Sequence, residues 1–157
     1  SIHVIHHTEF YYGEFFKGKT KEQAHREFFE ETLKCVKAFD CFNVLGHLDY
    51  IVRYGPYEDK TVDHQKYQDI IDEIFKTLIQ KGKGIEVNTS GYRDLKICGF
   101  PNFEQVQRYY DLGGRIITIG TDSHTSDRVG ENCLNVAKKY QEIGFDDVST
   151  FTQRKRD

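Results

Sequence analysis

The sequence predicts an α/β fold in which strands alternate with helices. Short runs of β-branched and apolar residues, typical of buried strands, recur along the 157 residues, and segments with apolar residues at helical spacing separate them. Strands joined by helices of this length are typical of a parallel sheet, either doubly wound or part of a βα barrel. In both architectures, functional sites lie at the carboxyl ends of the strands.

The expected strands are short apolar runs bounded by turn-forming or polar residues. The second ends at Gly46, and the fourth runs into Gly120. In order, we expect strands at residues 1–5, 43–45, 85–89, 115–120 and 148–151.

The expected helices span residues 20–39, 64–80, 102–113 and 131–143. Thr20, with Gln23 three positions later, predicts a capping box at the start of the first helix. Asn102 and Gln105 repeat that spacing in the third helix. Isoleucine, phenylalanine and leucine recur at helical spacing in the second helix and predict one apolar face.

Composition excludes several kinds of partner. The net charge is −3 and charged residues make up 30% of the chain, so the charge balance gives no electrostatic reason to expect nucleic acid or an anionic membrane as a partner. No apolar run reaches the roughly 20 residues that span a bilayer. The four cysteines, Cys35, Cys41, Cys98 and Cys133, form no C-x-x-C pair, and we expect reduced thiols in a cytoplasmic protein.

The chain contains no methionine and begins at Ser1, directly in a strand-like run. A natural protein of this length usually contains a few methionines and starts with one. We therefore expect the sequence to be a fragment of a longer protein.

Ionisable and polar side chains gather where the predicted strands end. Each alone has a simple explanation as a packed or turn-forming residue. Together they favour a metal site, because a core gains nothing from ionisable groups at one end of its sheet, and imidazole and carboxylate bind divalent cations. The residues are His3 in the first strand; His47 and Asp49 after the second; Glu86, Asn88, Ser90 and Arg93 in and after the third; and Asp122 and His124 after the fourth.

The remaining histidines are weaker candidates. His25 and His64 are expected to be solvated on or beside polar helix faces, and His6 and His7 are expected to be structural or exposed. The aromatic segment FYYGEFF, residues 10–16, is expected to pack over helix ends, with a substrate flap as the alternative.

Several segments resemble the histidinol-phosphatases of the PHP (polymerase and histidinol phosphatase) superfamily. These are GHLDYIVRYG, IEVNTSGYR, GTDSHT and the closing VSTFTQRKR, and SIHVI resembles the family's GS-[VI]-H strand. The resemblance implies a PHP-type distorted (β/α)7 barrel with up to three divalent metal ions (zinc, manganese or iron) at its C-terminal face. It further implies that residues 1–157 are a single partial PHP domain of about four to five βα units, without the N-terminal barrel strands and about half of the metal ligands.

The resemblance also implies roles for individual residues. His3, His47, Asp122 and His124 occupy metal-ligand positions, and Asp122 and His124 would act in catalysis through the metal centre. Two arginines are candidates for phosphate binding, because a guanidinium fork matches phosphate oxygens. They are Arg53 and Arg93, with Asn88 and Asp49 expected to line the pocket.

The implied activity is metal-dependent hydrolysis of a small phosphomonoester. The resemblance implies L-histidinol phosphate as the substrate, giving L-histidinol and phosphate in histidine biosynthesis. One alternative is another metal-dependent phosphoesterase of the same superfamily. Another is a non-catalytic partial domain that binds an ion weakly or serves in assembly, and we expect an unclosed barrel to self-associate through its open strand edges.

Overall fold

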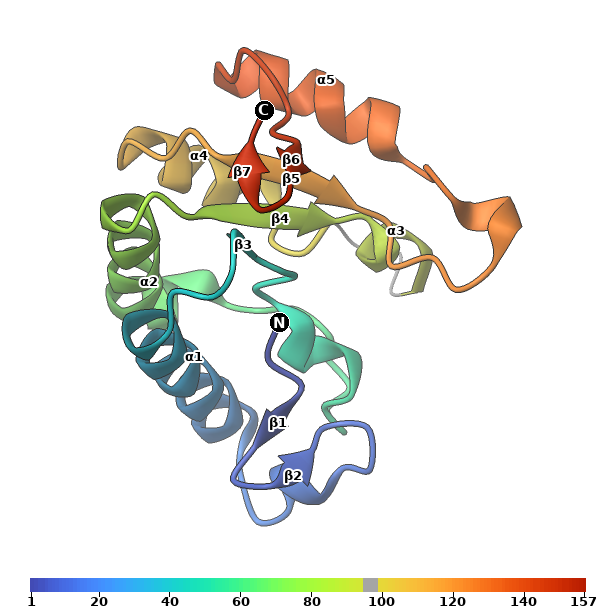
Figure 1. Cartoon of the computed structure of the whole chain (residues 1–157). Coiled ribbons are helices and arrows are strands. Elements are labelled where there is room, and N and C mark those ends of the chain that lie inside the picture. Colours follow the sequence, from blue (N-terminus) through green and yellow to red (C-terminus); the bar gives the residue numbers. More distant parts are fainter. Residues whose placement is uncertain (95–98) are drawn as a thin grey trace.

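The computed structural model describes residues 1–94 and 99–157 and centres on a parallel sheet (Figure 1). Its strands are β3 (Val44–Leu45), β4 (Gly84–Asn88) and β5 (Ile117–Gly120), in the order β3–β4–β5. Leu45 pairs with Ile85, and Ile85 in turn pairs with Ile117. The predicted α/β class and the parallel pairing of these strands are confirmed.

The predicted helices are confirmed with small shifts at their ends. Thr20 and Gln23 form the expected capping box, and the Asn102 side chain accepts a hydrogen bond of 3.0 Å from the backbone N–H of Gln105. The helices are α1 (Lys21–Ala38), α2 (Gln68–Gln80), α3 (Ser90–Asp94), α4 (Phe103–Asp111) and α5 (Cys133–Ile143), with short 3-10 turns η1 (Glu14–Phe16), η2 (Tyr50–Arg53), η3 (His64–Tyr67) and η4 (Ser126–Arg128).

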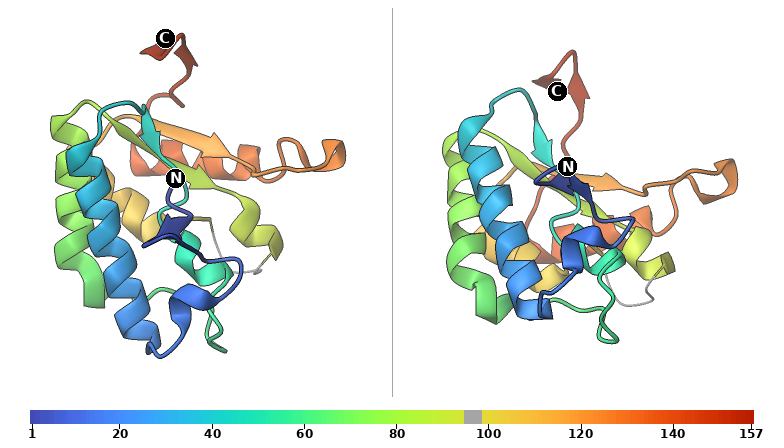
Figure 2. Two further views of the ribbon diagram at one scale, coloured as in Figure 1. Left: turned by 60° about the horizontal axis from the view of Figure 1, so that its bottom comes forward. Right: turned by 90° about the horizontal axis from the view of Figure 1, so that it is seen from below.

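Helices cover the sheet and form the core with it. Helices α1 and α2 lie side by side, while α5 lies along β5 (Figures 1 and 2). The predicted apolar face of α2 is confirmed, because Ile71, Ile74, Phe75 and Leu78 are fully buried. Among the described residues, no helix is both long and apolar enough to cross a bilayer.

The predicted parallel pairing of the first and last strands is wrong. Strand β1 (Val4–Ile5) pairs antiparallel with β2 (Thr8–Glu9), and β6 (Phe151–Thr152) pairs antiparallel with β7 (Lys155–Arg156). In both hairpins the two loop residues adopt positive φ, 50° and 61° at His6 and His7 and 49° and 65° at residues 153 and 154. Positive φ at both loop positions gives the tight turn whose twist suits an antiparallel hairpin.

The aromatic segment at residues 10–16 packs as expected in part. Phe10, Phe15 and Phe16 are buried, and Phe10 meets Phe28 of α1 edge-on. Its two tyrosines remain exposed, so the segment anchors one end of α1 while it displays other rings to solvent.

His25 and His64 are buried, so the prediction that they are solvated is wrong. His25 is only 1% exposed and lies beside the rings of Tyr57 and Tyr67. It follows Ala24 at the edge of the apolar stripe of α1, so the helix turns it inward. The expectation for His6 and His7 is confirmed, because both are exposed.

Candidate metal and phosphate site

Two predicted ligands, His3 and His47, meet beside the end of β3. Their Nε2 atoms lie 3.2 Å apart, and the Tyr50 ring stacks on both imidazoles at centroid distances of 4.4 and 4.5 Å. Burial lowers the pKa of His3, and it lowers the pKa of His47 to about 4. Both rings are therefore neutral at neutral pH, which is the form that ligates metal ions.

A second cluster joins Arg53, at the end of η2, to Asp122, which follows β5. Arg53 Nη1 donates to Asp122 Oδ2 at 2.7 Å, and Nη2 donates to the hydroxyl of Ser90. Burial alone would raise the pKa of Asp122, but the hydrogen bond and charge of Arg53 outweigh it and hold that pKa below its usual value. The carboxylate is thus ionised and forms an ion pair with the guanidinium of Arg53.

His124 does not join either cluster directly. Its ring is exposed, and Nδ1 donates to the backbone carbonyl of Asp122 at 2.9 Å. Among residues 1–94 and 99–157, no group of three or more His, Cys, Asp or Glu side chains lies close enough to hold a metal ion as arranged. The ligand set of His3, His47, Asp122 and His124 stays a prediction.

Glu86, which the sequence placed among the strand-end residues without an individual role, belongs to the site. Its Oε2 accepts from the backbone N–H of His47 at 3.1 Å and from Asn88 Nδ2 at 3.4 Å. A Cβ added at Gly120 would lie 1.9 Å from Glu86 Oε1, and one at Gly46 would lie 3.3 Å from Oε2. The two glycines thus leave room for a carboxylate that fixes the backbone of His47, and burial raises the pKa of Glu86.

The signal for Glu86 was present in the strand pattern. Glu86 and Asn88 flank the fully buried Val87 on β4, so their side chains share the opposite face of the sheet. Asn88 Oδ1 accepts from the backbone N–H of Ser90 at 3.0 Å and from its hydroxyl at 2.6 Å. Asn88 therefore orients the Ser90 hydroxyl, which in turn accepts the hydrogen bond from Arg53.

Arg93 also contacts the segment that carries Asp122. Its Nη1 donates to the backbone carbonyl of Thr121 at 3.4 Å and to Glu131 Oε2 at 3.2 Å. Arg53 and Arg93 thus approach the same loop from η2 and α3.

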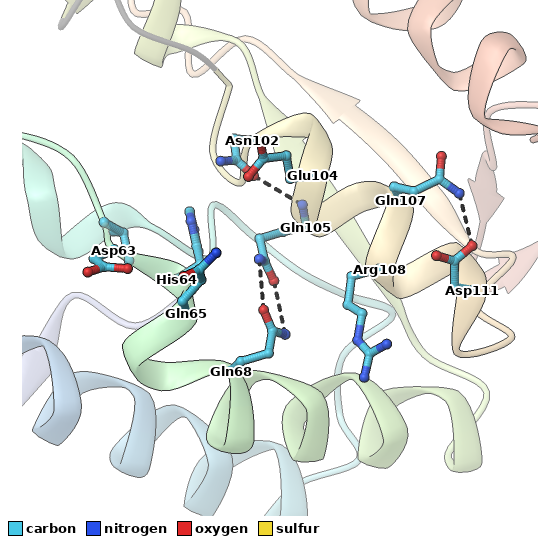
Figure 3. A pocket seen from close by; sticks show the side chains of 11 residues that line it. Asp63, His64, Gln65, Gln68, Asn102, Glu104, Gln105, Gln107, Arg108 and Asp111 are labelled. Carbon is cyan, nitrogen blue, oxygen red and sulfur yellow. Dashed lines mark hydrogen bonds between the residues drawn. The ribbon is translucent and has the colours of Figure 1, made fainter.

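Asp49 bonds to His64, and both side chains border a small pocket next to Phe100 and Asn102. Both carboxylate oxygens lie 3.0–3.1 Å from His64 Nε2, and Asp49 is only 3% exposed. Burial alone would lower the pKa of His64, but the charge of Asp49 outweighs it and raises that pKa. Because Asp49 lies between His47 and Arg53, the pair anchors the turn that carries both. His64 also borders a polar pocket between η3 and α4, where Gln68 and Gln105 exchange amide hydrogen bonds (Figure 3).

The chemical types of the donor atoms suit a divalent cation, although the described side chains bring no three of them together as arranged. The Nδ1 atom of His47 is buried and has no hydrogen-bond partner within the described part of the chain, and its Nε2 faces the Nε2 of His3. Two neutral imidazoles carry two nitrogen lone pairs, and the single contact between the rings uses at most one of them, so another stays available for a cation. With the ionised Asp122 nearby, the donor set of imidazole and carboxylate suits zinc, manganese or iron.

Comparison with known families decides where this chain belongs. The family described as PHP domain matches residues 1–90, which is more than half of the chain. The chain belongs to the PHP family. The resemblance seen in its motifs is confirmed, and its mixed α and β structure is a PHP-type fold.

The individual relatives that this chain is similar to are histidinol-phosphatases of the PHP family. The chain is 37% identical over 158 residues to the histidinol-phosphatase of Lactococcus lactis, covering all of this chain and 58% of the relative. It is 34% identical over 139 residues to a probable histidinol-phosphatase of Clostridium acetobutylicum, covering 88% of this chain and 54% of the relative. The chain therefore spans little more than half the length of these relatives.

A solved PHP structure superposes closely on this chain. The crystal structure of histidinol phosphate phosphatase from Lactococcus lactis, complexed with zinc, L-histidinol and phosphate, matches with a TM-score of 0.91 at 38% identity. The match covers 99% of this chain and 59% of that one. The fold of this chain is thus similar to that of the matching part of the Lactococcus lactis structure.

Proposed function

We propose that the protein to which this chain belongs is a metal-dependent phosphatase that hydrolyses L-histidinol phosphate to L-histidinol and phosphate. One observation carries the proposal. The His3–His47 pair and the Arg53–Asp122 pair lie at neighbouring strand ends of a chain that matches, over 99% of its length, a structure with zinc, L-histidinol and phosphate bound. The reaction would be a step of histidine biosynthesis in the cytoplasm.

His3, His47, Asp122 and His124 would hold the divalent ions, up to three in the whole site. When bound, such ions depress the pKa of water towards neutrality and offset charge on the phosphoryl oxygens. The surroundings of these side chains favour the protonation states that bind metal ions. Burial lowers the pKa of both imidazoles and so favours their neutral form, and Arg53 lowers the pKa of Asp122 and so favours the carboxylate. The zinc in the neighbour favours zinc, and manganese or iron would suit the same donors.

Arg53 would bind the phosphoryl group of the substrate. Its guanidinium is positioned by Ser90 and Asp122, and it lies 5.5 Å above the centre of the Tyr50 ring. A fixed, planar fork with several N–H donors suits the oxygens of a phosphate and the charge that develops on them during transfer. Arg93 would assist, since it bonds to the backbone carbonyl of Thr121, next to Asp122.

We further propose that residues 1–157 form the C-terminal portion of a distorted (β/α)7 barrel and a single partial PHP domain. The coverage of little more than half of each relative supports this. The remaining strands and ligands would come from the rest of the protein, so this portion alone would be inactive and would tend to self-associate through its strand edges.

The proposal is tested by phosphate release from L-histidinol phosphate, using the full-length protein. Activity should disappear after treatment with a chelator and return when zinc or manganese is added. The variants Asp122→Ala and His124→Ala should be inactive with either metal. Turnover that survives chelation, or that is unchanged in both variants, would contradict the proposal.

A further inference from the structure

A row of tyrosine rings leads from the paired imidazoles to the surface. Tyr50 stacks on His3 and His47, and Tyr54 lies 5.5 Å from Tyr50 in an edge-to-face arrangement. Tyr11 then meets Tyr54 edge-to-face at 5.6 Å. We call Tyr50, Tyr54 and Tyr11 the tyrosine row. Its inner end lies at the candidate metal ligands, and Tyr11, at its outer end, is 69% exposed.

The outer end of the row is held firmly by buried neighbours. Phe10 precedes Tyr11, and Phe15 and Phe16 follow it by a few positions, and all three are buried. Gly13 adopts φ 74° and its N–H bonds to the carbonyl of Phe10 at 3.0 Å, which closes the turn. The turn is thus fixed by the phenylalanines, while its tyrosine side chain contributes little to the core. Large rings displayed on a fixed turn are typical of surfaces that bind a ligand with little entropic cost.

The row lies within the reach of a small molecule held by Arg53. The guanidinium carbon of Arg53 and the ring centre of Tyr54 each lie 5.5 Å from the centre of the Tyr50 ring. They are therefore no more than twice that distance apart. A compact phosphate ester whose phosphoryl group binds Arg53 can therefore extend its other end toward Tyr54, and the Tyr11 ring lies 5.6 Å from that of Tyr54.

We infer that Tyr54 and Tyr11 bind the ring of the substrate, and that this contact selects phosphate esters with a flat heteroaromatic group. The inference rests on the proposed function, which supplies an imidazole as that ring. An imidazole offers a face for stacking, and its protonated form is also attracted to the face of a tyrosine. The two ends of the substrate are thus recognised separately, the phosphate by Arg53 and the ring by the tyrosine row.

The two products of the reaction separate these contacts in one experiment, performed on the full-length, metal-loaded protein. L-histidinol carries the ring without phosphate, and inorganic phosphate carries the other end without the ring. We would measure the inhibition constant of each against phosphate release by wild type, Tyr11→Leu, Tyr54→Leu and Tyr11→Phe. Phe39→Leu is the matched control, because Phe39 is an exposed aromatic residue at the opposite end of α1.

The two leucine variants should raise the inhibition constant of L-histidinol about three- to tenfold, the range expected for one lost aromatic contact. The inhibition constant of phosphate should stay unchanged in both. Tyr11→Phe should behave as wild type because it keeps the ring, and so should Phe39→Leu. Thermal unfolding of each variant shows whether it is folded, and the exposure of Tyr11 makes its replacement safe for the fold.

An active wild type whose leucine variants retain the affinity for L-histidinol would overturn the inference and leave the proposed function intact. An equal loss of affinity for both products would also overturn it, because the row would then act on the whole site. A wild type that releases no phosphate from L-histidinol phosphate would overturn the proposed function and the inference with it.

Discussion

Removal of the His64 ring should destabilise the protein strongly, because it leaves the Asp49 carboxylate buried without its bonded partner. Asp49 is 3% exposed and His64 is 8% exposed, and both oxygens of the carboxylate lie within 3.1 Å of Nε2. Removing one member of a buried ion pair typically costs about 3–5 kcal/mol, because the remaining charge stays desolvated. We therefore expect His64→Ala to lower the free energy of unfolding by about 3 kcal/mol or more.

The assay is urea unfolding of the full-length protein at neutral pH. The control is His6→Ala, because His6 forms the same kind of pair with Glu27 at 3.6 Å, but its side chain is 69% exposed. An exposed pair contributes little, and we expect a loss below about 1 kcal/mol. The double variant Asp49→Asn/His64→Ala should regain part of the lost stability, because its buried amide carries no charge. A cost for His64→Ala no larger than that for His6→Ala would refute the reasoning.

Three further predictions concern other parts of the fold. Burial lowers the pKa of His25 to about 4, below the ordinary value of 6.5. The stability that the neutral, buried ring contributes is therefore complete above pH 6.5 and is lost as the pH falls towards 4. His25→Phe should lack this pH-dependent loss, which amounts to up to about 3 kcal/mol, when the free energy of unfolding is measured across the acid range. Gly120→Ala would push a methyl group into the Glu86 carboxylate, and we expect it to lower the free energy of unfolding in urea by about 1–3 kcal/mol and to reduce phosphatase activity. The control is Gly82→Ala, where a Cβ meets open space but φ is 63°. It should cost about 1 kcal/mol and leave activity intact. Thr20→Ala removes the capping box of α1 and should cost about 1 kcal/mol, measured by the same unfolding assay.

The features that the sequence predicted well are local ones. The capping box of Thr20 and Gln23 involves residues three positions apart, and the apolar face of α2 repeats within one helix, so both follow from neighbouring residues. The three inner strands are short runs rich in apolar and β-branched residues, which is typical of a buried sheet. Local patterns therefore established the class of the fold.

The features that it missed depend on distant partners. The strand character of Val4 and Ile5 did not reveal an antiparallel partner, because the hairpin turn uses two histidines at positive φ instead of an Asn-Gly pair. The sequence does not predict the burial of His64, because its partner Asp49 lies 15 positions away along the chain. A carboxylate at the end of a strand can thus bind an ion or anchor a turn, and only the packing distinguishes the two.

The candidate site also combines features that local motifs predict with contacts that depend on distant residues. The motifs predicted metal-ligand positions for His3 and His47, and the structure brings their Nε2 atoms within 3.2 Å of each other, while the ligand role stays a prediction. They did not predict that Glu86 would hold the backbone of His47, because that contact depends on the space left by Gly46 and Gly120. One notable residue of the sequence, Cys98, lies outside the described residues.

The most direct test of the central claim is the metal content of the full-length protein, measured by atomic spectroscopy on wild type, His47→Ala and Arg93→Ala. If His47 is a ligand and Arg93 binds phosphate, His47→Ala should lose bound metal together with phosphatase activity. Arg93→Ala should keep the wild-type metal content and instead show a raised KM for L-histidinol phosphate. A His47→Ala protein with its full complement of metal, or an Arg93→Ala protein that has lost it, would contradict this assignment of the site.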